Sequence, residues 1–138
     1  MKSSTDSVRT PKNILASIRK EFGPFFDPAP FRKKFDPKKH TDGLKIDWKP
    51  VTFVNPPYSR VEPWVQKAHA EWRKGNTVIM FIKLENIGTA YAKKYIRGAE
   101  LRILSEKLSF PGYSGKARFN NVLVIWRNNK HSYKYSII

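Results

Sequence analysis

The chain has 138 residues, of which 40% are apolar and 14% aromatic, so it can enclose one hydrophobic core but is too short for two ordinary domains. It contains no cysteine, which excludes disulfides, thiolate metal sites and a cysteine nucleophile. Its 27 Lys and Arg against 11 Asp and Glu give a net charge of +16, which favours a protein that binds a polyanion, nucleic acid above all, over a basic surface kept for solubility.

The first predicted element is a helix. Thr10-Pro11 has the form of an N-cap followed by proline at the first helical position, and Gly23 ends the pattern. The apolar residues between them recur at helical spacing: Ile14, Leu15, Ile18 and Phe22. We expect one domain over residues 1–138, with residues 1–9 flexible.

Two apolar runs then end in loops that contain proline. Phe25-Phe26 leads into Asp27-Pro28-Ala29-Pro30, and the β-branched run 51–54 leads into Asn55-Pro56-Pro57-Tyr58-Ser59. Because two prolines cannot continue a sheet ladder, the second loop is predicted at the carboxyl end of a strand. Residues 30–50 between the runs are basic and rich in proline, and they predict no regular element.

The rest of the chain alternates between helical and extended patterns. Helices are predicted at 61–74 and 89–96, and strands at 77–82, 100–104 and 121–126. This order predicts an α/β fold with a small, Rossmann-like, mainly parallel sheet. Since no helix separates the last two strands, they are expected to form an antiparallel hairpin at the C-terminal edge of the sheet.

The loop Asn55-Pro56-Pro57-Tyr58 suits the methylation of a planar amine. Ligands of open α/β sheets bind outside the carboxyl ends of the strands, where this loop is expected. The nitrogen of such an amine is a poor nucleophile, and hydrogen-bond acceptors such as the Asn55 oxygen hold it and stabilise its developing charge. The prolines stiffen the loop, and the Tyr58 ring offers a face for stacking an extruded base. The alternative is a strand that ends in prolines and has no chemistry.

Asp27 lies in a second loop that is expected at the same edge. A carboxylate there can bind an amino group or a ribose, or offset a positive charge. An aspartate beside proline is equally typical of a turn, and the residues alone leave both interpretations open.

The loop resembles the catalytic motif of amino-group methyltransferases, and the wider pattern resembles the phage-type, Dam-like DNA N6-adenine methyltransferases over about residues 10–126. The matching segments, in chain order, are Thr10-Pro11, Glu21-Phe22-Gly23, Asp27-Pro28-Ala29, Asp42-Gly43-Leu44, Trp48, residues 53–59, Trp64-Val65 and Lys67-Ala68. This resemblance implies a methyltransferase that uses S-adenosyl-L-methionine to methylate a flipped adenine in DNA, as in a virus or mobile element.

The resemblance also implies roles for individual residues. The catalytic residues would be Asn55, Pro56, Pro57 and Tyr58. The cofactor site would contain Thr10, Pro11, Asp27, Pro28, Ala29 and Asn55. For DNA we expect contacts from Tyr58 and Ser59 and from a basic run, which contains Arg32, Lys33, Lys34, Lys38 and Lys39.

Three departures from the family pattern bear on cofactor affinity and the outer edge of the site more than on methyl transfer. They are Pro30, Lys83 with Glu85, and Glu106-Lys107-Leu108. Lys83 is interpreted equally as a phosphate contact or a solvated side chain. Alternative functions are methylation of RNA or of a protein glutamine, or an inactive DNA-binding relic or partner-dependent subunit of the same fold. For the protein itself, a homodimer or a complex with a partner subunit is left open.

Other sites receive little support from the sequence. No apolar stretch reaches the length of a membrane span, so we expect no membrane contact and a cytoplasmic protein, in the host cytoplasm if it is viral. His40, His69 and His131 match no metal-ligand spacing, so no metal is expected. His69 is interpreted as a packing or surface residue, and the absence of a Gly-rich dinucleotide loop argues against nicotinamide or flavin chemistry.

Overall fold

The computed structural model describes residues 8–31, 36–105, 115, 119–128 and 134–138. Its helices are α2 (Lys12–Phe22), α3 (Val61–Arg73) and α4 (Ala90–Tyr95), with short 3-10 turns η1 (Gly43–Lys45), η2 (Tyr58–Arg60) and η3 (Leu84–Gly88). Its strands are β1 (Val51–Val54), β2 (Thr77–Lys83), β3 (Glu100–Ile103), β4 (Asn121–Trp126) and β5 (Lys134–Ile137). Within these ranges no helix combines the length and the apolar character that a membrane crossing requires.

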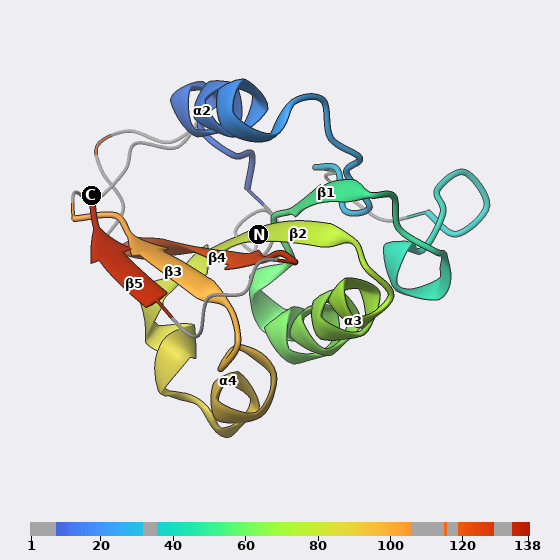
Figure 1. Ribbon diagram of the computed structural model, residues 1–138. Coiled ribbons are helices and arrows are strands. Elements are labelled where there is room, and N and C mark those ends of the chain that lie inside the picture. Colours follow the sequence, from blue (N-terminus) through green and yellow to red (C-terminus); the bar gives the residue numbers. More distant parts are fainter. Residues whose placement is uncertain (1–7, 32–35, 106–114, 116–118, 129–133) are drawn as a thin grey trace.

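The strands form one sheet in the order β1-β2-β4-β3-β5, with α2 on one face and α3 and α4 on the other (Figure 1). β1 pairs with β2 in parallel, and β3 pairs with β5 in parallel. β4 runs antiparallel to both of its neighbours, so the other four strands share one direction. The predicted α/β class is therefore confirmed.

The predicted hairpin is present, but its place in the sheet differs from the prediction. β3 and β4 pair antiparallel as expected, yet β4 lies between β2 and β3 instead of at an edge. All six residues of β4 are buried, which requires cover on both faces and a neighbour on each side. The edge is occupied by β5, in a segment where no strand was predicted.

Two predicted boundaries near the N-terminus also shift. The run Phe25-Phe26 makes only an isolated parallel bridge, between Phe26 and Thr52, because Pro28 follows and has no N–H for a ladder. Helix α2 begins at Lys12 with Pro11 at the N-cap, whereas Thr10 was predicted there. Gly23 ends the helix as expected, in a left-handed conformation with φ of 84°.

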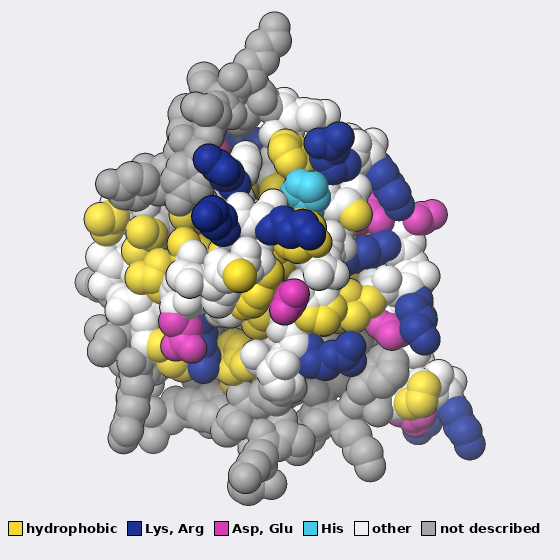
Figure 2. Space-filling view, turned by 90° about the horizontal axis from the view of Figure 1, so that it is seen from below, with side chains coloured by type: hydrophobic (Ala, Val, Ile, Leu, Met, Phe, Trp, Pro, Cys, Tyr) yellow, Lys and Arg dark blue, Asp and Glu magenta, His cyan; other side chains and the backbone are white. Residues whose placement is uncertain are grey.

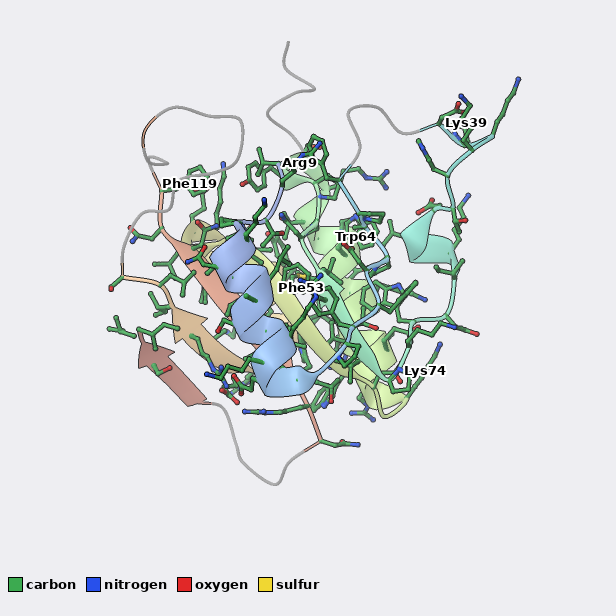
Figure 3. The ribbon with its side chains drawn as sticks, turned by 90° about the horizontal axis from the view of Figure 1, so that it is seen from above. Arg9, Lys39, Phe53, Trp64, Lys74 and Phe119 are labelled. Carbon is green, nitrogen blue, oxygen red and sulfur yellow. The ribbon has the colours of Figure 1, made fainter. Side chains whose placement is uncertain are left out.

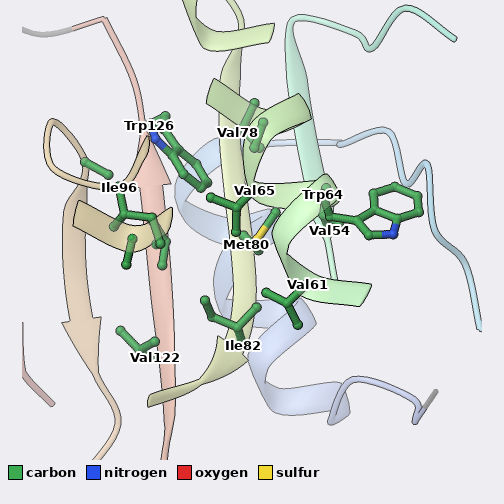
Figure 4. Close-up of a cluster of buried hydrophobic side chains, with 14 of the residues drawn as sticks. Val54, Val61, Trp64, Val65, Val78, Met80, Ile82, Ile96, Val122 and Trp126 are labelled. Atoms are coloured by element: carbon green, nitrogen blue, oxygen red, sulfur yellow. The ribbon is translucent and has the colours of Figure 1, made fainter. Parts of the chain in front are cut away.

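Apolar side chains fill both spaces between the sheet and its helices. Val61, Trp64 and Val65 of α3 face a layer of strand residues, which Figure 4 shows with Val54, Met80 and Ile82. The opposite layer joins α2 to the other side of the same strands, through Ile14, Ile18, Phe53, Ile79, Phe81, Leu104, Leu123 and Ile125. Successive residues of β1 and β2 alternate between the two layers, as the pleat of a strand requires.

Charged pairs fasten the end of α2 to the sheet. Two nitrogens of the Arg102 guanidinium in β3 donate to the two carboxylate oxygens of Glu21, at 2.6 and 2.7 Å. Glu100 accepts from Arg102 at 2.9 Å and from Arg127 at 2.7 Å. The Arg102 guanidinium lowers the pKa of Glu21 because it stabilises the ionised carboxylate.

A buried carboxylate, Glu71 of α3, joins three segments. Its side chain is 1% exposed and accepts hydrogen bonds from the Trp48 N–H at 3.2 Å and the Asn76 amide at 2.8 Å. The ammonium groups of Lys67 and Lys74 both lie 3.0 Å from its other oxygen. Burial by itself raises the pKa of Glu71, but these donors together outweigh it and hold the pKa below the ordinary value.

We predict that Glu71→Ala lowers the free energy of unfolding by about 3 kcal/mol, because it leaves buried donors without their acceptor. Urea denaturation measures the change. Gln66→Ala, at an exposed position of the same helix, is the control and should stay within about 0.5 kcal/mol of the parent.

The pH dependence follows from the lowered pKa of Glu71. A group whose native pKa is depressed stabilises the fold above its unfolded pKa and loses that contribution as the pH falls through the native pKa. The stability difference between the parent and Glu71→Gln should therefore shrink between about pH 7 and about pH 3. A constant difference over that range would contradict the role of the ionised carboxylate.

Candidate functional site at the carboxyl ends of the strands

Asn55 follows β1 directly and is held by the N-terminal segment. Its side-chain nitrogen donates to the Val8 carbonyl at 2.9 Å and to the Thr10 hydroxyl at 2.8 Å. These contacts explain why Thr10 does not cap α2, since its hydroxyl binds Asn55 instead. With both N–H groups engaged, the side-chain oxygen is the acceptor that Asn55 can present to a ligand, and its direction is fixed.

The prolines after Asn55 shape the rest of the loop. Pro56 is buried, and Pro57, with φ of −58°, precedes the turn η2, which runs directly into α3. The Pro57 carbonyl accepts from the Arg60 N–H at 3.1 Å, which closes that turn. This turn holds Tyr58 and the exposed Ser59 in η2.

The Tyr58 ring belongs to a cluster that the sequence did not predict. The ring of Phe119 meets it edge-on, with 5.9 Å between the ring centroids. The Lys83 ammonium lies 4.4 Å from the centroid of each ring. The sequence was interpreted equally as giving Lys83 a phosphate contact or a solvated side chain. Neither interpretation included a contact with these rings. No sequence signal marked Phe119, because the segment before it predicted no element.

Asp27 lies on the segment beside β1, and its geometry is that of a turn. One carboxylate oxygen accepts from the Ala29 N–H at 2.9 Å. The Phe26–Thr52 bridge runs parallel to β1, so Asp27 and Asn55 follow neighbouring segments to the same edge of the sheet. The structure thus brings Thr10 into contact with Asn55 and places the Asp27 loop on the adjacent segment.

Gly43 locks the Asp27 loop against α3. A Cβ atom at position 43 would lie 2.0 Å from the Pro28 carbonyl oxygen and 2.8 Å from Cη2 of Trp64. The Gly43 carbonyl accepts from the Trp48 indole N–H at 2.8 Å, which holds η1 in this position. The Asp-Gly pair in the sequence pattern therefore serves a close backbone approach.

Only some of the basic residues predicted to contact DNA lie in the described part of the chain. Lys38 and Lys39 are exposed on a tight turn in which the Lys39 N–H donates to the Asp36 carbonyl, and Figure 3 shows Lys39 projecting away from the sheet. Arg32, Lys33 and Lys34 lie outside the described residues, as does the departure at residues 106–108. More Lys and Arg side chains are scattered over the face of α3 and α4 (Figure 2).

His69 packs between aromatic rings, as predicted. Its ring centroid lies 5.6 Å from that of Trp72 and 5.4 Å from that of Tyr95. Burial, with the charge of Arg73, lowers its pKa and so favours the neutral ring. In the described part of the chain, no group of three or more His, Asp and Glu residues could hold a metal ion.

Comparisons with known proteins identify one matching family. A family model described as DNA N-6-adenine-methyltransferase (Dam) matches residues 1–137. Among curated proteins none matches the sequence. One similar crystal structure is described as a predicted O-methyltransferase from Agrobacterium tumefaciens, with 17% identity and a TM-score of 0.45. The likeness covers 70% of this chain and 45% of that one, so the chain spans less than half of its length.

We predict that Gly43→Ala destabilises the protein by about 1–3 kcal/mol, because the added methyl group must displace the Pro28 backbone. Urea denaturation measures the effect. Gly88→Ala is the matched control, since a Cβ atom there would meet nothing within 4 Å. Equal stabilities of the two variants would show that the Pro28 loop yields freely.

Proposed function

The chain belongs to the DNA N-6-adenine-methyltransferase (Dam) family, and from that premise we propose that it transfers a methyl group to the N6 amine of an adenine extruded from DNA. The observation that carries the proposal is the fixed amide of Asn55. Its nitrogen binds Val8 and Thr10, which directs its oxygen to act as an acceptor at the carboxyl end of β1. The family match over residues 1–137 supports the choice of adenine and of DNA.

The proposed role of Asn55 follows from the chemistry of the amine. The N6 lone pair is delocalised into the adenine ring, so the nitrogen must lean towards tetrahedral geometry before it attacks. An acceptor on its N–H holds the amine in place and gains strength as positive charge develops on the nitrogen. A main-chain carbonyl of the Pro56-Pro57 segment is a suitable second acceptor, since proline residues keep their carbonyls while lacking N–H groups.

The residues around Asp27 fit the cofactor that the family implies. S-adenosyl-L-methionine, when bound, supplies a methyl group activated by a sulfonium. One oxygen of Asp27 is tied to the Ala29 N–H, but a carboxylate keeps further acceptor capacity for an amino or hydroxyl donor. Thr10, Pro28 and Ala29 would line the same edge. Pro11 would act indirectly. Its carbonyl accepts from the Ile14 N–H at 3.1 Å at the start of α2, and this contact would position the preceding residue, Thr10.

DNA would approach the edge that holds Asn55 and Tyr58. An extruded adenine would stack on the Tyr58 ring, and extrusion costs least where the base is mispaired. Ser59 would contact the strand beside Tyr58, and Lys38 and Lys39 would contact phosphates at longer range. The protein would act in the compartment that holds its DNA, which for a viral enzyme is the host cytoplasm.

We predict that the parent protein, incubated with labelled S-adenosyl-L-methionine and duplex DNA, forms N6-methyladenine, as nucleoside analysis would show. Asn55→Ala should lower kcat by about 100-fold or more, because it removes an acceptor that acts mainly in the transition state. Thr10→Val should cause a smaller loss, about 5-fold, since the Val8 carbonyl still holds the amide.

Calorimetry with S-adenosylhomocysteine provides the control, because Asn55→Ala keeps Thr10 and the Asp27 loop and should lose much less in affinity for it than in kcat. Parallel reactions with RNA and with protein identify another substrate. Methylation of RNA alone would contradict the DNA proposal, and a parent rate for Asn55→Ala would contradict the role of the loop.

We also predict that DNA affinity falls steeply with salt, because each phosphate contact releases counterions. Lys39→Gln should reduce the slope of log affinity against log salt concentration by up to roughly 1. Lys20→Gln, at the far end of α2, removes the same charge and should change the slope less. Fluorescence anisotropy with a labelled duplex measures both, and equal slopes would exclude a local contact at Lys39.

A further inference from the structure

Lys83 lies at the end of β2, beside the loop that carries Asn55. Its ammonium is 4.4 Å from the centroids of both Tyr58 and Phe119, and those rings meet edge-on. In the described part of the chain Lys83 forms no ion pair. The two aromatic faces are therefore the contacts that determine where this half-buried cation rests.

The backbone brings Lys83 and Phe119 together independently of their side-chain contact. Lys83 pairs with Asn121 in the β2–β4 ladder, and the Leu84 N–H donates to the Asn120 carbonyl at 2.9 Å. Phe119 directly precedes this pairing. The Lys83 carbonyl accepts from the Asn86 side chain at 3.0 Å, which holds the start of η3. Replacing the Lys83 side chain would thus leave the strand and its partners in place.

We propose that Lys83 is a positioning residue for the target adenine. Lys83 sets the orientation of the Tyr58 ring through a cation–π contact that it shares with Phe119. The inference rests on the proposed function, in which the base stacks on Tyr58. A ring on a loop can rotate about its side-chain bonds, and stacking needs one defined plane. A cation held over the ring from β2 restricts that rotation, and Phe119 blocks the ring from a second side.

The electrostatics of the site make this assignment more specific than a packing role. The ammonium of Lys83 carries a positive charge, which a side chain held by packing alone would not need. The negative faces of two aromatic rings offset that charge where it stands. The contact should therefore depend on the charge of Lys83 and on the presence of the Tyr58 ring, and not only on the volume of the side chain.

The test compares Lys83→Met, Lys83→Arg and the parent in steady-state methylation of one duplex, alone and in a Tyr58→Leu background. Lys83→Met keeps the apolar stem and should lower kcat/KM for DNA by about 3- to 30-fold. Lys83→Arg keeps a cation that stacks on rings and should stay within about 2-fold of the parent. With Leu at position 58, Lys83→Met should change the remaining rate by less than about 2-fold.

Lys94→Met is the matched control, because the Lys94 ammonium lies 5.3 Å from the ring of Tyr95 on α4, away from the loop. It removes the same charge and should keep the parent rate. Affinity for S-adenosylhomocysteine should be unchanged by Lys83→Met, and the melting temperature should fall by no more than about 4 °C.

The outcomes separate the two proposals. If the parent methylates no DNA, the proposed function fails and the inference fails with it. If the parent is active but Lys83→Met matches it, or Lys83→Arg loses as much as Lys83→Met, only the role of Lys83 is overturned. An equal loss from Lys83→Met with and without the Tyr58 ring would likewise overturn it.

Discussion

The candidate site depends on the point at which β1 stops. Pro56 and Pro57 have no N–H groups, so the ladder with β2 cannot continue past Val54 and the chain must leave the sheet. Asn55 therefore stands at the edge, where the segment before α2 supplies two acceptors for its amide. The same exit leads through η2 into α3, whose apolar face packs on the sheet, mainly against β2. One backbone constraint thus sets both the loop and the helix behind it.

The two acceptors also select asparagine over its isostere at position 55. An aspartate would set a carboxylate oxygen against the Val8 carbonyl, with acceptor facing acceptor and no proton between them. Asparagine instead divides its functions, with the nitrogen joined to the fold and the oxygen presented to a ligand. The Thr10 hydroxyl serves this arrangement better than it would serve α2, whose start is already shaped by Pro11.

Local pattern predicted the helices, most strands and the position of the Asn55 loop, because apolar spacing and proline act over a few residues. It could not predict which strands are neighbours, and the central position of β4 became evident only from its pairing and its burial on both faces. Contacts between distant segments were also beyond it. Thr10 reaches Asn55 across 45 positions, Gly43 meets Pro28, and Lys83 lies over Phe119, and none of these has a local signature.

The central position of β4 has a consequence for biosynthesis. Among the strands, β1 and β2 leave the ribosome first, and an isolated pair of strands is only marginally stable in water. The apolar side of α2 is also incompletely buried until β4 is present. Its layer includes Leu123 and Ile125 of β4 in addition to Phe53 of β1. The nascent polypeptide can therefore close its sheet and hold Val8 and Thr10 against Asn55 only after residue 126 has been translated. Catalytic competence would therefore not build up strand by strand but would follow the insertion of β4 between β2 and β3.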